Sequence, residues 1–146
     1  MTRVINSNSP AKRRRQFLRT VAEIVHRLAA KNGIDEEARD MLAMMIFSLR
    51  GVKETVEETV LPWEKRGYWK KAAAFELEWE WAGETALRLE NLLRDERWER
   101  LPELMVGMQK FLAGISVNRL TRSPELWRGS YRRLTASPPP GTAEAD

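Results

Sequence analysis

Apolar residues recur every three or four positions along most of this chain, the period of helices that bury one face. The pattern is most regular between residues 68 and 93, where the spacings alternate between four and three without a break. The residues of this stripe are Tyr68, Ala72, Phe75, Trp79, Ala82, Ala86, Leu89 and Leu93. Shorter stripes cover 17–28, 38–60 and 101–115, and no stretch alternates apolar and polar residues as a strand would. The pattern therefore predicts an all-α fold.

Capping and proline signals set the expected limits of the first two helices. Ser9 followed by Pro10 has the form of an N-cap and a proline at the first helical position, which predicts a helix from about residue 10 to 32. Asp35 has the form of a second N-cap. The helix that it begins should stop at about residue 60, because Pro62 lacks the N–H that a helix interior requires.

The later helices are shorter. A charged connection over 94–100 precedes the fourth helix, and Ser123 followed by Pro124 predicts a fifth, which carries Trp127, Tyr131 and Leu134 on one face. Short loops between long amphipathic helices favour antiparallel neighbours. We therefore expect an up-down-up-down bundle of four main helices with a short fifth, in one domain over 10–135. Residues 1–9 should be a flexible N-terminus and 136–146 a disordered, proline-rich tail.

The second and third helices carry a second apolar face that the four stripes do not use. Something must cover these side chains, either the fifth helix or another subunit. The candidate oligomer-interface residues on this face are Phe47, Leu77, Trp81 and Leu92. An alternative arrangement is therefore two long hairpins that pair in a dimer.

Composition narrows the function classes. The chain has 146 residues, a formal net charge of +4 and no cysteine, which excludes disulfide scaffolds, thiol catalysis and cysteine-based metal sites. Its longest apolar run, from Met41 to Phe47, is too short to span a bilayer. We expect a cytoplasmic protein with no membrane partner.

Glu23 and His26 form the one pair with the spacing found in carboxylate-bridged di-metal bundles. A helical projection turns both toward solvent, and His26 is the only histidine, so a second such pair cannot exist. The glutamates of the second and third helices are a further candidate for magnesium, but they flank the core and are better explained as a solvated face. We expect no cofactor, no metal and no catalysis, and rank a metal-dependent enzyme third among the function classes.

Basic residues are concentrated in three stretches that lie far apart in the sequence, at residues 12–15, 63–71 and 119–133. In an up-down-up-down bundle these stretches should converge at one pole, where fourteen basic residues, Arg3 among them, against five acidic ones leave about +9. The candidate anion-binding residues are Lys12, Arg13, Arg14, Arg15, Lys65, Arg66, Trp69, Lys70, Lys71, Arg119, Arg122, Arg128, Arg132 and Arg133.

A basic surface with aromatic residues among the cations suits two kinds of partner. It fits an acidic protein surface or the acidic pole of a second copy, and it equally fits phosphate backbones with unpaired bases. The leading hypothesis is a non-catalytic helical interaction module that docks an acidic protein or itself. The alternative is a nucleic-acid-binding accessory protein that uses the same residues.

Overall fold

A computed structural model of the chain describes residues 8–140, and in them every regular element is helical. The elements are α1 (Pro10–Ala29), α2 (Glu36–Lys65), α3 (Trp69–Arg94), the short 3-10 turn η1 (Trp98–Arg100), α4 (Leu101–Leu112), the 3-10 turn η2 (Pro124–Leu126) and α5 (Ser130–Thr135). The all-α prediction is confirmed for this part of the chain. Residues 1–7 and 141–146, with Arg3 and most of the predicted flexible N-terminus and tail, lie outside the described residues.

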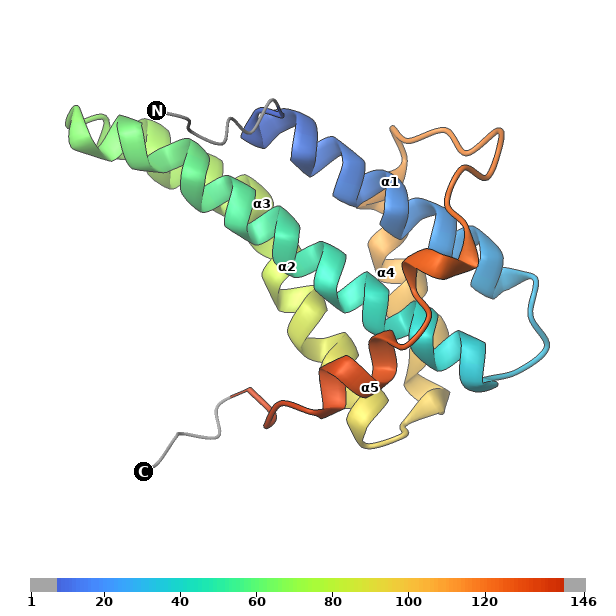
Figure 1. Ribbon diagram of the computed structural model, residues 1–146. Coiled ribbons are helices and arrows are strands. Elements are labelled where there is room, and N and C mark those ends of the chain that lie inside the picture. The colour runs from blue at the N-terminus through green and yellow to red at the C-terminus, as the bar shows by residue number, and fades with distance from the viewer. Residues whose placement is uncertain (1–7, 141–146) are drawn as a thin grey trace, which may run out of the picture.

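The longest helix, α2, lies between α1 and α3 and runs antiparallel to both (Figure 1). Arg13 near the start of α1 pairs with Glu58 near the end of α2, whereas Lys31 just after α1 pairs with Glu37 at the start of α2. The α2–α3 hairpin projects beyond the rest of the molecule, and its tip lies at the same end as the beginning of α1.

The two short helices cover parts of this three-helix arrangement. Through Phe111, α4 stacks on Trp81 of α3 with ring centroids 4.4 Å apart, and α5 lies across α2 and α3 near the end opposite the hairpin tip. Because α4 is only 12 residues long and touches α1 and α3 sparingly, the predicted up-down-up-down bundle of four main helices is not confirmed.

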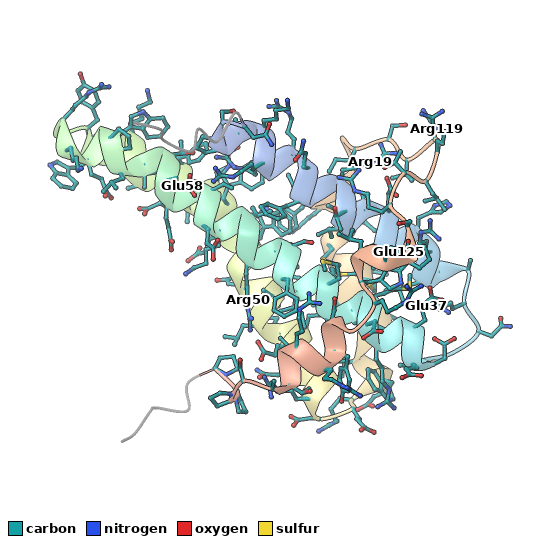
Figure 2. All side chains as sticks on the ribbon, in the orientation of Figure 1. Arg19, Glu37, Arg50, Glu58, Arg119 and Glu125 are labelled. Carbon is teal, nitrogen blue, oxygen red and sulfur yellow. The ribbon has the colours of Figure 1, made fainter. Side chains whose placement is uncertain are left out.

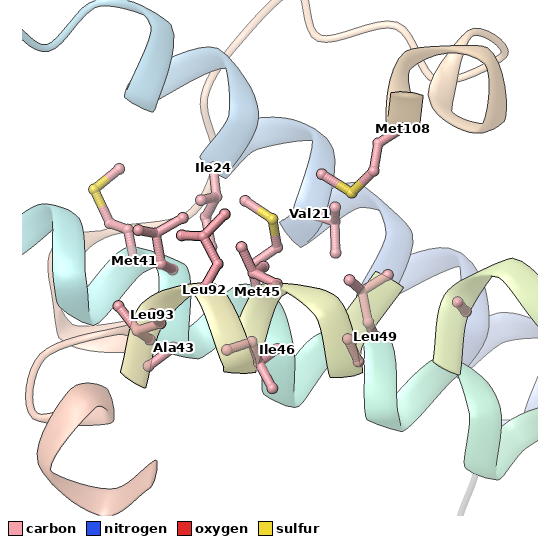
Figure 3. Packing of buried hydrophobic residues seen from close by; sticks show 14 of the residues in the cluster. Val21, Ile24, Met41, Ala43, Met45, Ile46, Leu49, Leu92, Leu93 and Met108 are labelled. Atoms are coloured by element: carbon pink, nitrogen blue, oxygen red, sulfur yellow. The ribbon is translucent and has the colours of Figure 1, made fainter. Parts of the chain in front are cut away.

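The core is the seam in which α2 meets α1 and α3, closed by α4 and α5 (Figure 3). Many of its side chains come from the predicted stripes, but Leu92 was expected on the second apolar face and is buried in the core instead. Withdrawing each large apolar side chain from water contributes about 2 kcal/mol. Labelled members are Val21, Ile24, Met41, Ala43, Met45, Ile46, Leu49, Leu92, Leu93 and Met108.

Two predicted helix limits are wrong. Pro62 does not stop α2, which continues for one more turn to Lys65, because proline forfeits only its own bond and the Arg66 N–H still reaches the Pro62 carbonyl at 3.2 Å. The helix ends at Lys65, and the chain turns at Gly67, whose φ of +82° is a left-handed value that glycine adopts without strain. The predicted fifth helix is split in the same way by Gly129, also at φ +82°, into η2 and α5.

Gly51 of α2 lies against the Phe17 ring of α1 and gives a first prediction. A Cβ on Gly51 would lie 2.6 Å from the Phe17 ring, so Gly51→Ala should lower the free energy of unfolding by about 1–2 kcal/mol despite alanine's better helix propensity. Gly107 in α4 is exposed with open space at its Cβ position, so Gly107→Ala should raise the same free energy by up to about 1 kcal/mol. Urea unfolding of both variants checks the opposite signs, and a Gly51→Ala protein as stable as the parent would contradict the packing described.

Candidate partner-binding surface

Two of the three predicted basic stretches lie at one end of the molecule, at the start of α1 and at the tip of the α2–α3 hairpin. The Ser9 side chain accepts a hydrogen bond from the Lys12 N–H and begins α1, as predicted from the sequence. At the tip, Gly67 turns the chain and the Tyr68 N–H donates to the Trp63 carbonyl at 2.8 Å. Arg13 lies opposite Glu58, so the two stretches are separated by about 12 Å along α2.

Two cations of the first stretch are held by side chains of α2, Arg14 in a buried position and Arg13 in an ion pair at the surface. Arg14 is only 7% exposed, where it donates to the Thr55 and Thr59 hydroxyls at 3.0 and 2.7 Å, and its guanidinium lies 5.0 Å from the Phe75 ring centroid. Burial lowers the pKa of Arg14. Arg13 pairs with Glu58 at 2.6 Å, and this hydrogen bond raises the pKa of Arg13. Both residues tie α1 to α2, so neither charge is free to meet a partner.

The remaining cations at this end are exposed. Lys71 lies over the Trp63 ring, 4.3 Å from its centroid, and shares its charge with that aromatic face. The other five have no ion pair among the described residues, and two exposed aromatic residues stand beside them, Trp69 at 64% and Tyr68 at 52%. We define the basic end as Lys12, Arg15, Lys65, Arg66, Trp69 and Lys70.

The third stretch does not join the basic end, contrary to the prediction. Asp40, in the first turns of α2, accepts hydrogen bonds from the Gly129 and Tyr131 N–H groups at 3.1 and 2.9 Å. Residues 128–133 therefore lie near the end of α2 opposite the hairpin tip. Figure 2 shows the same separation, with Arg119 and Glu125 far from Glu58.

Within the third stretch, the arginines fall into two groups. Arg122 is engaged internally: its guanidinium donates to Thr20 and to the Gln16 carbonyl, at 3.0 Å in both cases. Arg133 lies over the Phe47 ring at 5.3 Å. The exposed members, away from the basic end, are Arg119, Arg128, Arg132 and Arg133.

The residue that holds this segment in place is Glu23, which the sequence had placed in solvent. That prediction is wrong, because Glu23 is 0% exposed beneath the segment that follows α4. Its carboxylate accepts hydrogen bonds from the Thr121 hydroxyl at 2.6 Å, from the Thr121 and Arg122 N–H groups at 2.8 and 2.9 Å, and from Arg19 at 2.7 Å. Burial alone would raise the pKa of Glu23, but these hydrogen bonds outweigh it and lower the pKa to about 2.

His26 is exposed, as predicted, and so points away from the buried Glu23 carboxylate. Across residues 8–140, no group of three or more His, Cys, Asp or Glu side chains is placed to hold a metal ion. A cavity of about 640 Å³ between α3 and α4 is lined by neither residue, and its lining includes both basic and acidic side chains.

The second apolar face finds most of its cover within the chain. Leu92 is 5% exposed, Trp81 is half-buried against Phe111, and Phe47 is half-buried beneath Arg133. Of the four candidate interface residues only Leu77 is mostly exposed, at 71%. From the sequence, either the fifth helix or a second subunit was expected to cover this face. In the structure α4 and α5 together cover most of it.

The chain matches no protein-family model, no curated protein and no solved structure in the comparisons made with each. Among residues 8–140, none of the helices combines the length and the apolar character needed to cross a bilayer.

Proposed function

We propose that this protein is a non-catalytic helical interaction module whose basic end docks an acidic protein surface. The observation that carries the proposal is a set of five exposed cations, unpaired within residues 8–140, beside an indole that is 64% exposed. Large aromatic side chains and arginine are the residues that most often anchor protein interfaces. Exposed cations around them raise the rate of encounter with an acidic partner.

The projecting shape of the α2–α3 hairpin supports the same proposal. Its tip stands clear of α4 and α5, so a partner can approach it from several sides (Figure 1). The cations at the tip are positioned by a helix end and a glycine turn, elements that need no ordering when a partner binds.

A binding measurement tests the proposal. We define the tip-reversal variant as Lys65→Glu, Arg66→Glu and Lys70→Glu, and the loop-reversal variant as Arg119→Glu, Arg128→Glu and Arg132→Glu. Both change the net charge equally, but only the first changes the basic end. A fluorescent polyglutamate peptide should bind the parent protein with an affinity that falls as salt rises from about 50 to about 300 mM.

The tip-reversal variant should lose at least about tenfold in affinity for this peptide, and the loop-reversal variant much less. Equal losses would mean that net charge alone drives binding, and no binding by the parent at low salt would remove the proposal. Circular dichroism of all three proteins checks that helix content is unchanged.

The second candidate is a nucleic-acid-binding accessory protein, favoured by the exposed faces of Tyr68 and Trp69 between cations. Unpaired bases stack on such rings, each contributing about 1–3 kcal/mol. A labelled single-stranded oligonucleotide in the same assay separates the two functions. Tighter binding of the oligonucleotide than of polyglutamate, lost on Trp69→Ala, would favour the nucleic-acid function.

A further inference from the structure

The α2–α3 hairpin has a second exposed face, which covers residues 53–61 of α2 and 69–87 of α3 and continues to the hairpin tip. Part of it is a groove of about 380 Å³ between the two helices, with an apolar floor formed by Val56, Trp79 and Leu87. Four carboxylates and one ammonium surround this floor. The charged residues that line the groove are Lys53, Glu57, Glu76, Glu80 and Glu84.

Exposed apolar side chains continue the face toward the tip. Leu61 is four residues after Glu57 and Trp69 is seven before Glu76, so each shares its helix side with the groove. Leu61, Trp69 and Leu87 are 51%, 64% and 47% exposed. One face thus combines an acidic half over the groove with a basic half at the tip, and Leu61 lies between them.

The charged residues of the two halves lie at equal distances, measured along the helices, on either side of Leu61 and Leu77. Trp63 packs on Phe75 with ring centroids 5.4 Å apart, which places Leu61 of α2 level with Leu77 of α3. Lys65 lies four residues beyond Leu61 toward the tip, and Glu57 lies four residues before it. On α3, Lys70 and Glu84 are each seven residues from Leu77, on opposite sides.

We infer that this face docks a second copy of the chain, in a two-fold dimer whose hairpins run antiparallel with the symmetry axis at Leu61. The inference rests on the proposed function and names its partner. In this register α2 faces α2 and α3 faces α3 of the other copy. Each Lys65 then meets a Glu57, each Lys70 meets a Glu84, and each Trp69 lies over the groove beside a Leu87.

The size of the face sets the strength of this dimer. From residue 53 to the tip it is about 21 Å long and two helices wide, which gives about 400 Å² on each copy. This area is at the low end for specific complexes, so the dimer is weak and its dissociation constant lies in the micromolar range. The two Glu76 carboxylates approach each other beside the axis and oppose association.

Charge exchange between copies tests the inference. Sedimentation equilibrium of the full chain at low salt should show a monomer–dimer equilibrium that the tip-reversal variant abolishes. A groove-reversal variant, Glu57→Lys, Glu80→Lys and Glu84→Lys, should also be monomeric. An equimolar mixture of the two variants should associate again, because each reversed tip meets a reversed groove. The loop-reversal variant should dimerise like the parent, and Glu76→Gln should dimerise at least about twofold more tightly.

The outcomes separate this inference from the proposed function. A parent protein that stays monomeric at several hundred micromolar, or a dimer indifferent to both reversals, overturns the inference. If that monomer still binds polyglutamate through its tip, the proposed function stands and the partner is a different acidic protein. If the monomer does not bind polyglutamate either, the dimer inference and the proposed function are both wrong.

Discussion

Replacing Glu23 with alanine is expected to lower the free energy of unfolding by about 3 kcal/mol, one of the two largest effects of a single substitution in this chain. The carboxylate is fully buried, and its removal leaves the Thr121 and Arg122 N–H groups without their acceptor. It also leaves Arg19 without its only ion pair in the described chain. The segment between α4 and α5 would then lose its main attachment to α1.

Urea unfolding followed by circular dichroism measures this loss. Glu125→Ala is the matched control, because Glu125 is a 71% exposed carboxylate whose nearest cation, Arg128, is 3.9 Å away. Its replacement should cost less than about 1 kcal/mol. A Glu23→Ala protein no less stable than this control would contradict the buried attachment.

The same carboxylate makes stability depend on pH with a definite sign. The pKa of Glu23 is about 2 in the folded protein against an ordinary value of 4.5, so its stabilising effect is complete above pH 4.5. The effect is lost as the pH falls from 4.5 toward 2. The difference in unfolding free energy between the parent and Glu23→Gln should therefore shrink over this pH window. The other carboxylates titrate in both proteins, so their contributions cancel in this difference.

Trp127→Ala is expected to destabilise the protein by about 3–5 kcal/mol. The indole is 1% exposed, its Nε1–H donates to Glu37 at 3.2 Å, and the Arg27 guanidinium lies 5.1 Å from its ring centroid. The substitution leaves a large cavity between the starts of α2 and α5. Thermal and urea unfolding should both show the loss.

Trp69→Ala is the control for this substitution. Trp69 is 64% exposed, so its replacement should change stability by less than about 0.5 kcal/mol. The same replacement should weaken binding to the polyglutamate peptide. Similar destabilisation by both substitutions would contradict the burial of Trp127.

Helix periodicity and capping predicted the part of the fold that depends on local signals. The unbroken stripe from Tyr68 to Leu93 became α3, and Ser9 and Asp35 cap α1 and α2 as expected. The predicted end of α2 at about residue 60 was wrong because a proline disrupts the helical turn before it, whereas the turn after Pro62 could still form.

The candidate surface was less predictable, because it depends on where an irregular segment runs. Residues 116–123 carry no apolar period, so nothing in the sequence indicated that they return over α1 to Glu23. That path carries Arg128 and Arg132 away from the basic end. Nor could charge counting reveal that Arg14 is buried between Thr55 and Phe75, since burial of a cation depends on the partners that surround it.

The most direct test of the basic end is to map the contact residue by residue, by titrating polyglutamate into the isotope-labelled protein and following its backbone NMR signals. We expect the largest shifts at residues 65–70, smaller ones at 12–15, and none at 128–133. Shifts centred on 119–133, or none anywhere at low salt, would contradict it.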